Sequence, residues 1–286
     1  MTPQVLALCT AISYAAANVS VRRGLHYSSA ATATLISLIV HSVVLWSAVF
    51  LTGGVPEVAM TAVVLIAITG VLQTGMRLWH YMGIEKVGTS RAVTLRSTHP
   101  IFSVVIGVTI LHEQVTLEIL LGTFLVVAGI VTTSWRVEEQ ISTFRWQHLL
   151  FPMVTALITG IVHPIRRAAM LISDEPLFFA ALVGPISLIC FTTTLTFPAM
   201  RGRIVWNPKS LLSFISAGVF ETLAVLFMLT AFVTGPVVLV SPIAATSPIW
   251  TLLMGVVFLR DLERINRYAV IGTIGVVAGV IAIYLA

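Results

Sequence analysis

Charged residues are scarce in this chain. Asp, Glu, Lys and Arg together make up 9% of its 286 residues, whereas soluble domains contain about 25%. So few charges cannot cover a folded surface against water, which argues against a soluble protein. Hydrophobic residues make up 58% and lie in long runs, as expected for helices that face lipid.

Cysteine is nearly absent as well. Cys9 and Cys190 fall inside apolar runs with no other cysteine nearby, so we expect no disulfide framework and no metal site. The chain has no nucleotide-binding motif, so ATP does not drive a cycle directly, and we expect no cofactor. The net charge of +5 comes from residues scattered over loops, which predicts no nucleic-acid partner.

The apolar residues form ten runs. They cover roughly 3–21, 29–52, 58–82, 89–111, 115–135, 148–170, 177–199, 209–232, 237–259 and 265–286. Tight turns, from Gly83 to Gly88 and from Thr234 to Pro236, join the third run to the fourth and the eighth to the ninth. The runs are too long for barrel strands, so the sequence predicts an all-α membrane protein with ten transmembrane helices.

The first run has two interpretations. Ala15, Ala16 and Ala17 resemble the cleavage site of a signal peptide, but no basic residue precedes the run, and Arg22 and Arg23 follow it. This charge order is the reverse of that in a signal peptide, which favours a mature helix.

The end of the chain repeats a stretch near its middle. Pro100 and Pro248 each open an apolar run, and Glu113 and Asp261 close these runs; the members of each pair are 148 residues apart. Two glycines seven residues apart follow in each copy. A repeat of this size makes half the chain the unit of construction.

Five helices per half is an odd number, so the second half enters the membrane inverted. The sequence therefore predicts two inverted five-helix repeats, at 1–140 and 141–286, which is a common transporter construction. The correspondence between the two halves also includes polar positions of the first and sixth runs. These are Thr10, Tyr14, Asn18 and Arg22, and, 145 residues later, Thr155, Thr159, His163 and Arg167.

Each repeat contains a helix with a proline, an acidic residue at its end, a short turn and a glycine-rich helix. This pattern runs from Arg96 to Gly129 and again from Ser247 to Gly279. Both segments resemble the EamA-type repeat of the drug/metabolite transporter superfamily. The resemblance implies a ten-helix transporter, but it names no substrate. The chain also departs from the family at Tyr14-Ala15, where Trp-Gly is common, and lacks an arginine often found early in the second span.

Glu221 is the clearest candidate for function, because it lies near the middle of its run, too deep to reach the membrane surface. Ionisable residues at this depth usually face a cavity or a partner. We predict that Glu221 is a proton-coupling group. The alternative is a structural carboxylate bonded to Ser, Thr or Arg of a neighbouring helix.

The tight turn after the third run places its polar residues at the depth of those in the fourth. Gln73, Arg77 and His80 share one face of the third run, and Arg96 and His99 share a face of the fourth. Two arginines on adjacent helices favour a fork-like site for a carboxylate or phosphate. Arg77 has an alternative, which is to extend to the membrane interface.

Other polar residues complete the predicted substrate site. They are Tyr14, Asn18, His163, Ser241 and Ser247. A lone histidine such as His163 is more often a hydrogen-bonding residue between helices than a ligand.

The repeated prolines and acidic residues are assigned to structure or gating. Pro100 and Pro248 either kink their helices or free carbonyls for a substrate. Glu113 and Asp261 end their runs, so we expect caps or gate residues at the surface. The glycines of the fifth and tenth runs suit close helix packing, and a homodimer through these two helices is a further expectation.

The orientation has two conflicting indications. Most basic residues fall in loops on one side, and only Arg166 and Arg167 are assigned to the opposite loops, which would place both termini outside. The family resemblance implies that both termini are inside.

These features together predict an integral membrane protein, of bacterial inner-membrane type. We expect a secondary transporter of a small polar metabolite, either amino-acid-like or an organic anion, that exports or imports by alternating access. An enzyme is not expected, because the short loops supply no catalytic constellation. The alternative is a scaffold or sensor, in which Glu221 and Arg96 could be replaced without loss.

Overall fold

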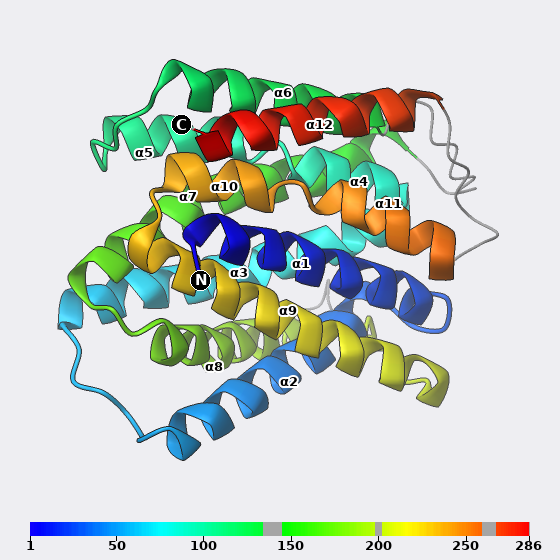
Figure 1. Ribbon diagram of the computed structural model, residues 1–286. Coiled ribbons are helices and arrows are strands. Elements are labelled where there is room, and N and C mark those ends of the chain that lie inside the picture. Colours follow the sequence, from blue (N-terminus) through cyan, green and yellow to red (C-terminus); the bar gives the residue numbers. More distant parts are fainter. Residues whose placement is uncertain (134–144, 198–201, 259–266, 286) are drawn as a thin grey trace.

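A computed structural model describes residues 1–133, 145–197, 202–258 and 267–285, and the residues within these ranges form helices without any strand (Figure 1). The helices are α1 (Pro3–Leu25), α2 (Ala30–Leu51), α3 (Met60–Val87), α4 (Thr89–Arg96), α5 (Pro100–Thr109), α6 (Leu117–Thr133), η1 (Trp146–Leu149), α7 (Leu150–Ile172), α8 (Pro176–Leu195), α9 (Pro208–Thr234), α10 (Val237–Ala244), α11 (Ser247–Phe258) and α12 (Arg267–Leu285). The all-α prediction is therefore confirmed.

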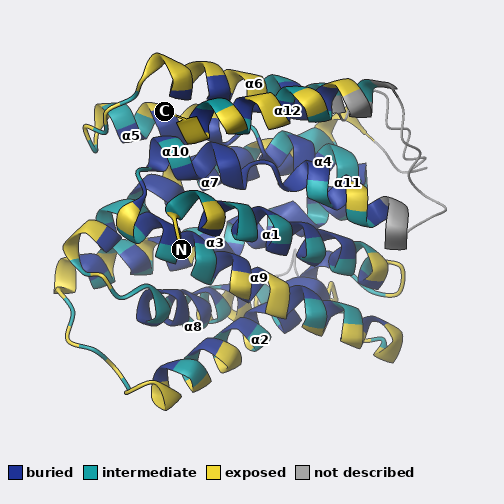
Figure 2. Ribbon diagram, in the orientation of Figure 1, coloured by how far each residue is buried: buried dark blue, intermediate teal, exposed yellow. Residues whose placement is uncertain are grey.

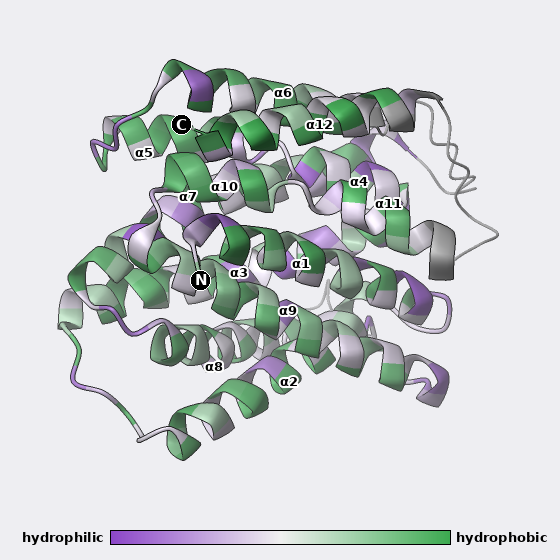
Figure 3. Ribbon diagram, in the orientation of Figure 1, coloured by the Kyte–Doolittle hydropathy of each residue, from purple (hydrophilic) through white to green (hydrophobic). Residues whose placement is uncertain are grey.

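The outer faces of the helices are apolar. Exposed side chains on α2, α6 and α9 include Phe50, Phe124 and Leu212, and the outward faces that are exposed in Figure 2 are largely hydrophobic in Figure 3. Seven of the described helical stretches are long and apolar enough to cross a membrane, and α6 and α12 are shorter apolar helices. A surface of this kind is stable against lipid and not against water, so the protein is an integral membrane protein.

Two predicted runs are not single helices. The run 89–111 is broken into α4 and α5, and the run 237–259 into α10 and α11. Both breaks come just before a repeated proline, Pro100 or Pro248. Proline lacks a backbone N–H and disfavours helical geometry in the residue before it, so each proline ends one helix and starts the next.

The predicted turn after the third run is also displaced. α3 continues to Val87, five residues beyond the predicted end, and Gly83 lies inside it. Gly88, with φ of 88°, reverses the chain in a conformation that only glycine adopts without strain. The turn before Pro236 agrees with the prediction, since α9 ends at Thr234 and α10 begins at Val237.

The two halves are interleaved. α1 packs mainly against α9 of the other half, and its counterpart α7 packs against α3. Matching arginines support this arrangement: Arg22 donates to the carbonyl of Ile84 at the end of α3, and Arg167 donates to the carbonyl of Phe232 at the end of α9. A cation is stabilising at the carboxyl end of a helix, so the repeated sequence makes repeated contacts across the halves.

The repeated glycines let α6 and α12 approach each other closely. A Cβ atom on Gly122 would lie 2.7 Å from the carbonyl oxygen of Gly279, and one on Gly129 would lie 2.7 Å from that of Gly272. α6 and α12 lie side by side in Figure 1, and their glycine faces meet within one chain. A homodimer through these helices remains a prediction, and it would have to use their outer faces.

A glycine pair in α12 provides a matched test of this contact. A Cβ atom on Gly279 would lie 2.6 Å from the Gly122 carbonyl oxygen, whereas one on Gly275, one turn earlier, would be 3.5 Å from its nearest neighbour. We expect Gly279→Ala to destabilise the protein by about 1–3 kcal/mol through overpacking, and Gly275→Ala to be neutral or slightly stabilising. Thermal unfolding in detergent measures both, and equal midpoints for the two variants would contradict the packing.

Candidate functional site

Buried polar side chains gather where helices of both halves meet. All the predicted substrate-binding residues and Glu221 belong to this group, and each is less than 10% exposed. We call the following residues the central cluster: Tyr14, Asn18, Gln73, Arg77, Tyr81, Arg96, His99, His163, Arg166, Glu221, Ser241 and Ser247.

Glu221 is paired with two residues of α3. Arg77 Nε lies 3.2 Å from Glu221 Oε1, and the Tyr81 hydroxyl donates to Glu221 Oε2. Arg77 and Tyr81 are four residues apart, so both point from one face of α3 toward α9. The Arg77 guanidinium is only 1% exposed and therefore does not extend to the membrane interface.

Arg96 has a different partner from Arg77. Its guanidinium carbon lies 4.7 Å from the centre of the Tyr14 ring, a cation–π contact between α4 and α1. The two arginines that were expected to form one fork are thus engaged separately, Arg77 by Glu221 and Arg96 by Tyr14.

Arg166 also belongs to the cluster, although the sequence had indicated a loop position for it. It was assigned to a loop with Arg167, but both lie inside α7, and Arg166 is fully buried. Its Nη2 donates to Gln73 Oε1 at 3.1 Å. The sequence did contain a signal, because Arg166 is three residues after His163 and so belongs to the same polar helix face.

The cluster has more positive than negative charge. It contains three buried arginines, namely Arg77, Arg96 and Arg166. Within the described residues one buried acid, Glu221, forms an ion pair with one of them, Arg77. Several donors have no partner in this part of the structure, namely Arg166 Nε and Nη1, Arg77 Nη2 and Gln73 Nε2. A buried hydrogen-bond donor without an acceptor costs free energy. An anion would supply acceptors for these donors.

Two histidines meet on one serine. His99 Nδ1 lies 3.1 Å and His163 Nδ1 lies 3.0 Å from Ser241 Oγ, and Ser103 Oγ lies 2.7 Å from the same oxygen. The two rings are 4.7 Å apart and nearly perpendicular. These bonds join the break between α4 and α5 to α7 and α10.

Asn18 extends the cluster along α1. Its Oδ1 lies 2.8 Å from His80 Nε2 of α3, and its Nδ2 lies 3.5 Å from Thr251 Oγ1 of α11. Ser247 begins α11 directly after the break, and its carbonyl accepts a hydrogen bond from Thr251. Within the described ranges, no three His, Cys, Asp or Glu side chains lie together as a metal site would require.

A family model for EamA-like transporters matches residues 1–135 and again 146–285. The chain belongs to the EamA-like transporter family. Membership places it in the drug/metabolite transporter superfamily, and the two matched segments correspond to the two repeats expected from the sequence.

Comparison of this EamA-family protein with solved structures supports the fold and gives no information on function. A solved structure described only as "Crystal structure of protein" has a TM-score of 0.77 and 13% sequence identity, covering 99% of this chain and 96% of the other. No curated protein sequence matches the chain.

Glu113 of this EamA-family protein caps a helix of the other repeat. Its carboxylate accepts hydrogen bonds from the backbone N–H groups of Val237 at 2.9 Å and Val238 at 3.0 Å, at the start of α10. Arg167 Nε lies 3.7 Å away, and the Glu113 side chain is only 8% exposed. The cap expected at this position is therefore present, although the carboxylate turns into the protein rather than toward solvent. Asp261, its counterpart, lies outside the described residues.

Loss of this cap gives a second test. We expect Glu113→Ala to lower stability by about 0.5–2 kcal/mol, because two N–H groups of α10 lose their acceptor. Glu57→Ala is the matched control, since Glu57 is exposed in the connection between α2 and α3. Thermal unfolding in detergent compares them, and an equal effect of both changes would disprove the cap.

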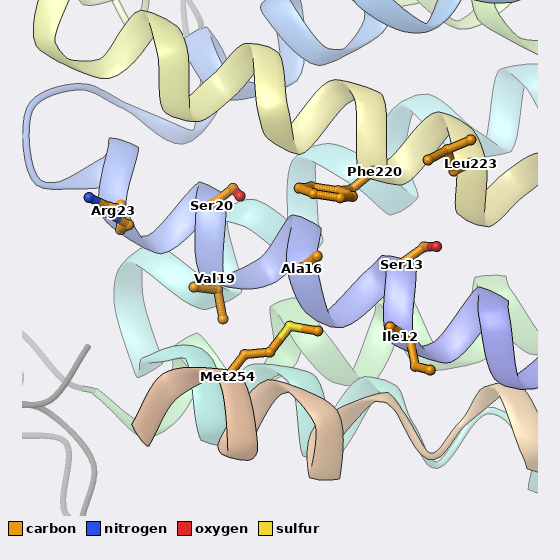
Figure 4. Close-up of a pocket in the computed structure, with 9 residues that line it drawn as sticks. All are labelled: Ile12, Ser13, Ala16, Val19, Ser20, Arg23, Phe220, Leu223 and Met254. Atoms are coloured by element: carbon orange, nitrogen blue, oxygen red, sulfur yellow. The ribbon is translucent and has the colours of Figure 1, made fainter. Parts of the chain in front are cut away.

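A separate groove lies on the outer face of α1 (Figure 4). It has a volume of about 430 Å³ and runs between α9 and α11, with Phe220 and Leu223 on one side and Met254 on the other. Arg23 lies at one end of this mainly apolar lining. The groove has none of the paired charges of the central cluster, so we place the candidate transport site in the cluster.

Proposed function

We propose that this EamA-family protein is a secondary-active transporter that moves a small polar metabolite, amino-acid-like or an organic anion, by alternating access. The observation that carries the proposal is the buried excess of positive charge between the two repeats. Charged groups inside a membrane protein are expensive and usually belong to a transport pathway. A scaffold or sensor would have no need for them.

The interleaved packing supports a rocking motion of the repeats. The breaks before Pro100 and Pro248 lie in counterpart helices of the two halves, as in transporters whose substrates bind near discontinuous helices. Each break carries cluster residues, His99 at the first and Ser247 at the second. Ten crossings in inverted repeats would place the cluster on the pathway between the two sides of the membrane.

Replacement of Arg96 tests this proposal. A thermal-shift panel of amino acids, organic acids and phosphorylated metabolites identifies a ligand, and uptake of that ligand into proteoliposomes follows. We expect Arg96→Ala to lower uptake at least about tenfold, since loss of a buried charged partner typically costs 2–5 kcal/mol.

Arg145→Ala is the control, because Arg145 is an exposed arginine outside the bundle core. Uptake by Arg96→Ala equal to that of the control and the wild type would reject the cluster as the transport site. Such a result would mean that the transport site lies elsewhere, whereas a wild type that takes up no ligand would favour the scaffold or sensor.

A further inference from the structure

The hydroxyl of Ser241 has more hydrogen-bonding neighbours than one proton can serve. His99 Nδ1, His163 Nδ1 and Ser103 Oγ all lie within 3.1 Å of it. A hydroxyl donates one hydrogen bond and accepts two. At most one neighbour receives the Ser241 proton, so at least two must donate theirs, and at least one of these donors is a histidine.

This arrangement makes His99 and His163, which we call the histidine pair, a single protonic unit. The hydroxyl connects the two rings, so that a change of tautomer on one ring is passed to the other. Histidine is the side chain that most readily gains and loses a proton near neutral pH. Glu221, in contrast, already shares its charge with Arg77.

Positive groups flank the histidine pair. Arg96 precedes His99 by three residues, and Arg166 follows His163 by three. The other groups facing this region are His80 of α3, bonded to Asn18, and the Tyr14 phenol of α1 beside Arg96; the Phe232 ring of α9 lies against His163. A proton added to His163 would be repelled by both guanidinium groups, and one added to His99 by that of Arg96.

An anion on Arg96 and Arg166 changes that balance. Its negative charge offsets the guanidinium groups, and it also satisfies the donors of Arg166 that have no partner within the described residues. A proton can then be added to the ring at little electrostatic cost. By linkage, the proton in turn strengthens anion binding by the same factor.

We propose that the histidine pair takes up one proton when an anion binds to Arg96 and Arg166, so that the two bind as a neutral unit. A hydronium ion on the open side gives up the proton, so that one of its O–H bonds breaks and water remains, and the proton forms an N–H bond on one imidazole, which becomes an imidazolium. Its charge cancels that of a monovalent anion. Transport of the two together rests on the proposed function, whereas the linkage is a binding property that stands without it.

Calorimetry on the purified protein tests the linkage. Acetate, succinate and inorganic phosphate are titrated at pH 7 in two buffers with different heats of ionisation, which reports the protons taken up per anion. We expect about one proton per anion in the wild type. We expect none in the double variant His99→Gln/His163→Gln, in which the amides still bond to Ser241.

His41→Gln is the matched control. His41 is fully buried in α2 but bonds to the Ala180 carbonyl and to Thr222, so its replacement leaves the proton count unchanged. Proton uptake that is absent from the wild type, or that persists in the double variant, would overturn the proposal. Failure of all three anions to bind would overturn it as well.

Proteoliposomes separate the linkage from transport. With acid outside, we expect uptake of the bound anion to be driven by the pH gradient in the wild type and in His41→Gln. The double variant is expected to lose the response to the gradient. Proton-linked binding without any uptake would reject the proposed function and leave the linkage standing.

Discussion

Arg166→Met is expected to abolish anion binding and uptake while leaving the protein as stable as the wild type or more stable. The guanidinium is fully buried and donates from Nη2 to Gln73, whereas Nε and Nη1 have no hydrogen-bond acceptor within the described residues. Replacing such a charge by an apolar side chain of similar size removes a desolvation penalty. A structural arginine would give the opposite result.

Two measurements decide this prediction. Thermal unfolding in detergent gives the stability, and anion binding gives the function, with a loss of at least about tenfold expected for removal of a buried charged partner. Arg167→Met is the control, because Arg167 holds the end of α9 and contacts Glu113; it is expected to lower stability and to affect binding less. A destabilised Arg166→Met that still binds anions would show that Arg166 is structural.

The sequence predicted the class and the repeat because both depend on composition and spacing. The hydrophobic runs determine which segments face lipid, and the 148-residue spacing shows that Pro100 and Pro248 are counterparts. The sequence did not predict the breaks between α4 and α5 and between α10 and α11. A proline inside an apolar run kinks one helix and divides another, and the outcome depends on the packing of the neighbouring helices.

Partners within the central cluster could not be assigned from sequence. The depth of Glu221 indicated a partner, but two candidate arginines lay at a similar level. Arg77 proved to be the partner because α3 places it and Tyr81 on the face toward α9. Arg166 was misplaced because its pair of adjacent arginines looked like a loop, although the spacing from His163 put it on the polar face of α7.

Glu113 shows a further limit of sequence reasoning. The repeat correctly marked it as a terminal residue, and a terminal acidic residue is usually at the surface. Its real contact is with the start of α10, more than a hundred residues away. A bond between repeats depends on how the halves interlock, which spacing does not reveal.

The pair formed by Arg77 and Glu221 gives the other large expected effect. Glu221→Leu leaves the Arg77 guanidinium buried without its counter-charge, and Arg77→Met leaves the carboxylate in the same state. Each single change is expected to cost about 3–5 kcal/mol, and the double change Arg77→Met/Glu221→Leu much less, because no unpaired charge remains. Thermal unfolding in detergent measures all three variants, and single losses that simply add in the double variant would contradict the pairing.

Transport by the double variant distinguishes the two interpretations of Glu221. If this carboxylate is the proton-coupling group, the double variant loses uptake driven by a pH gradient even when its stability has been restored. If the carboxylate only neutralises Arg77, the double variant retains that uptake, because the histidine pair and Arg166 are unchanged. Tyr81→Phe is the matched control, since it removes one hydrogen bond to Glu221 and leaves both charges in place. Its expected cost is about 0.5–3 kcal/mol, and it should retain uptake under either interpretation.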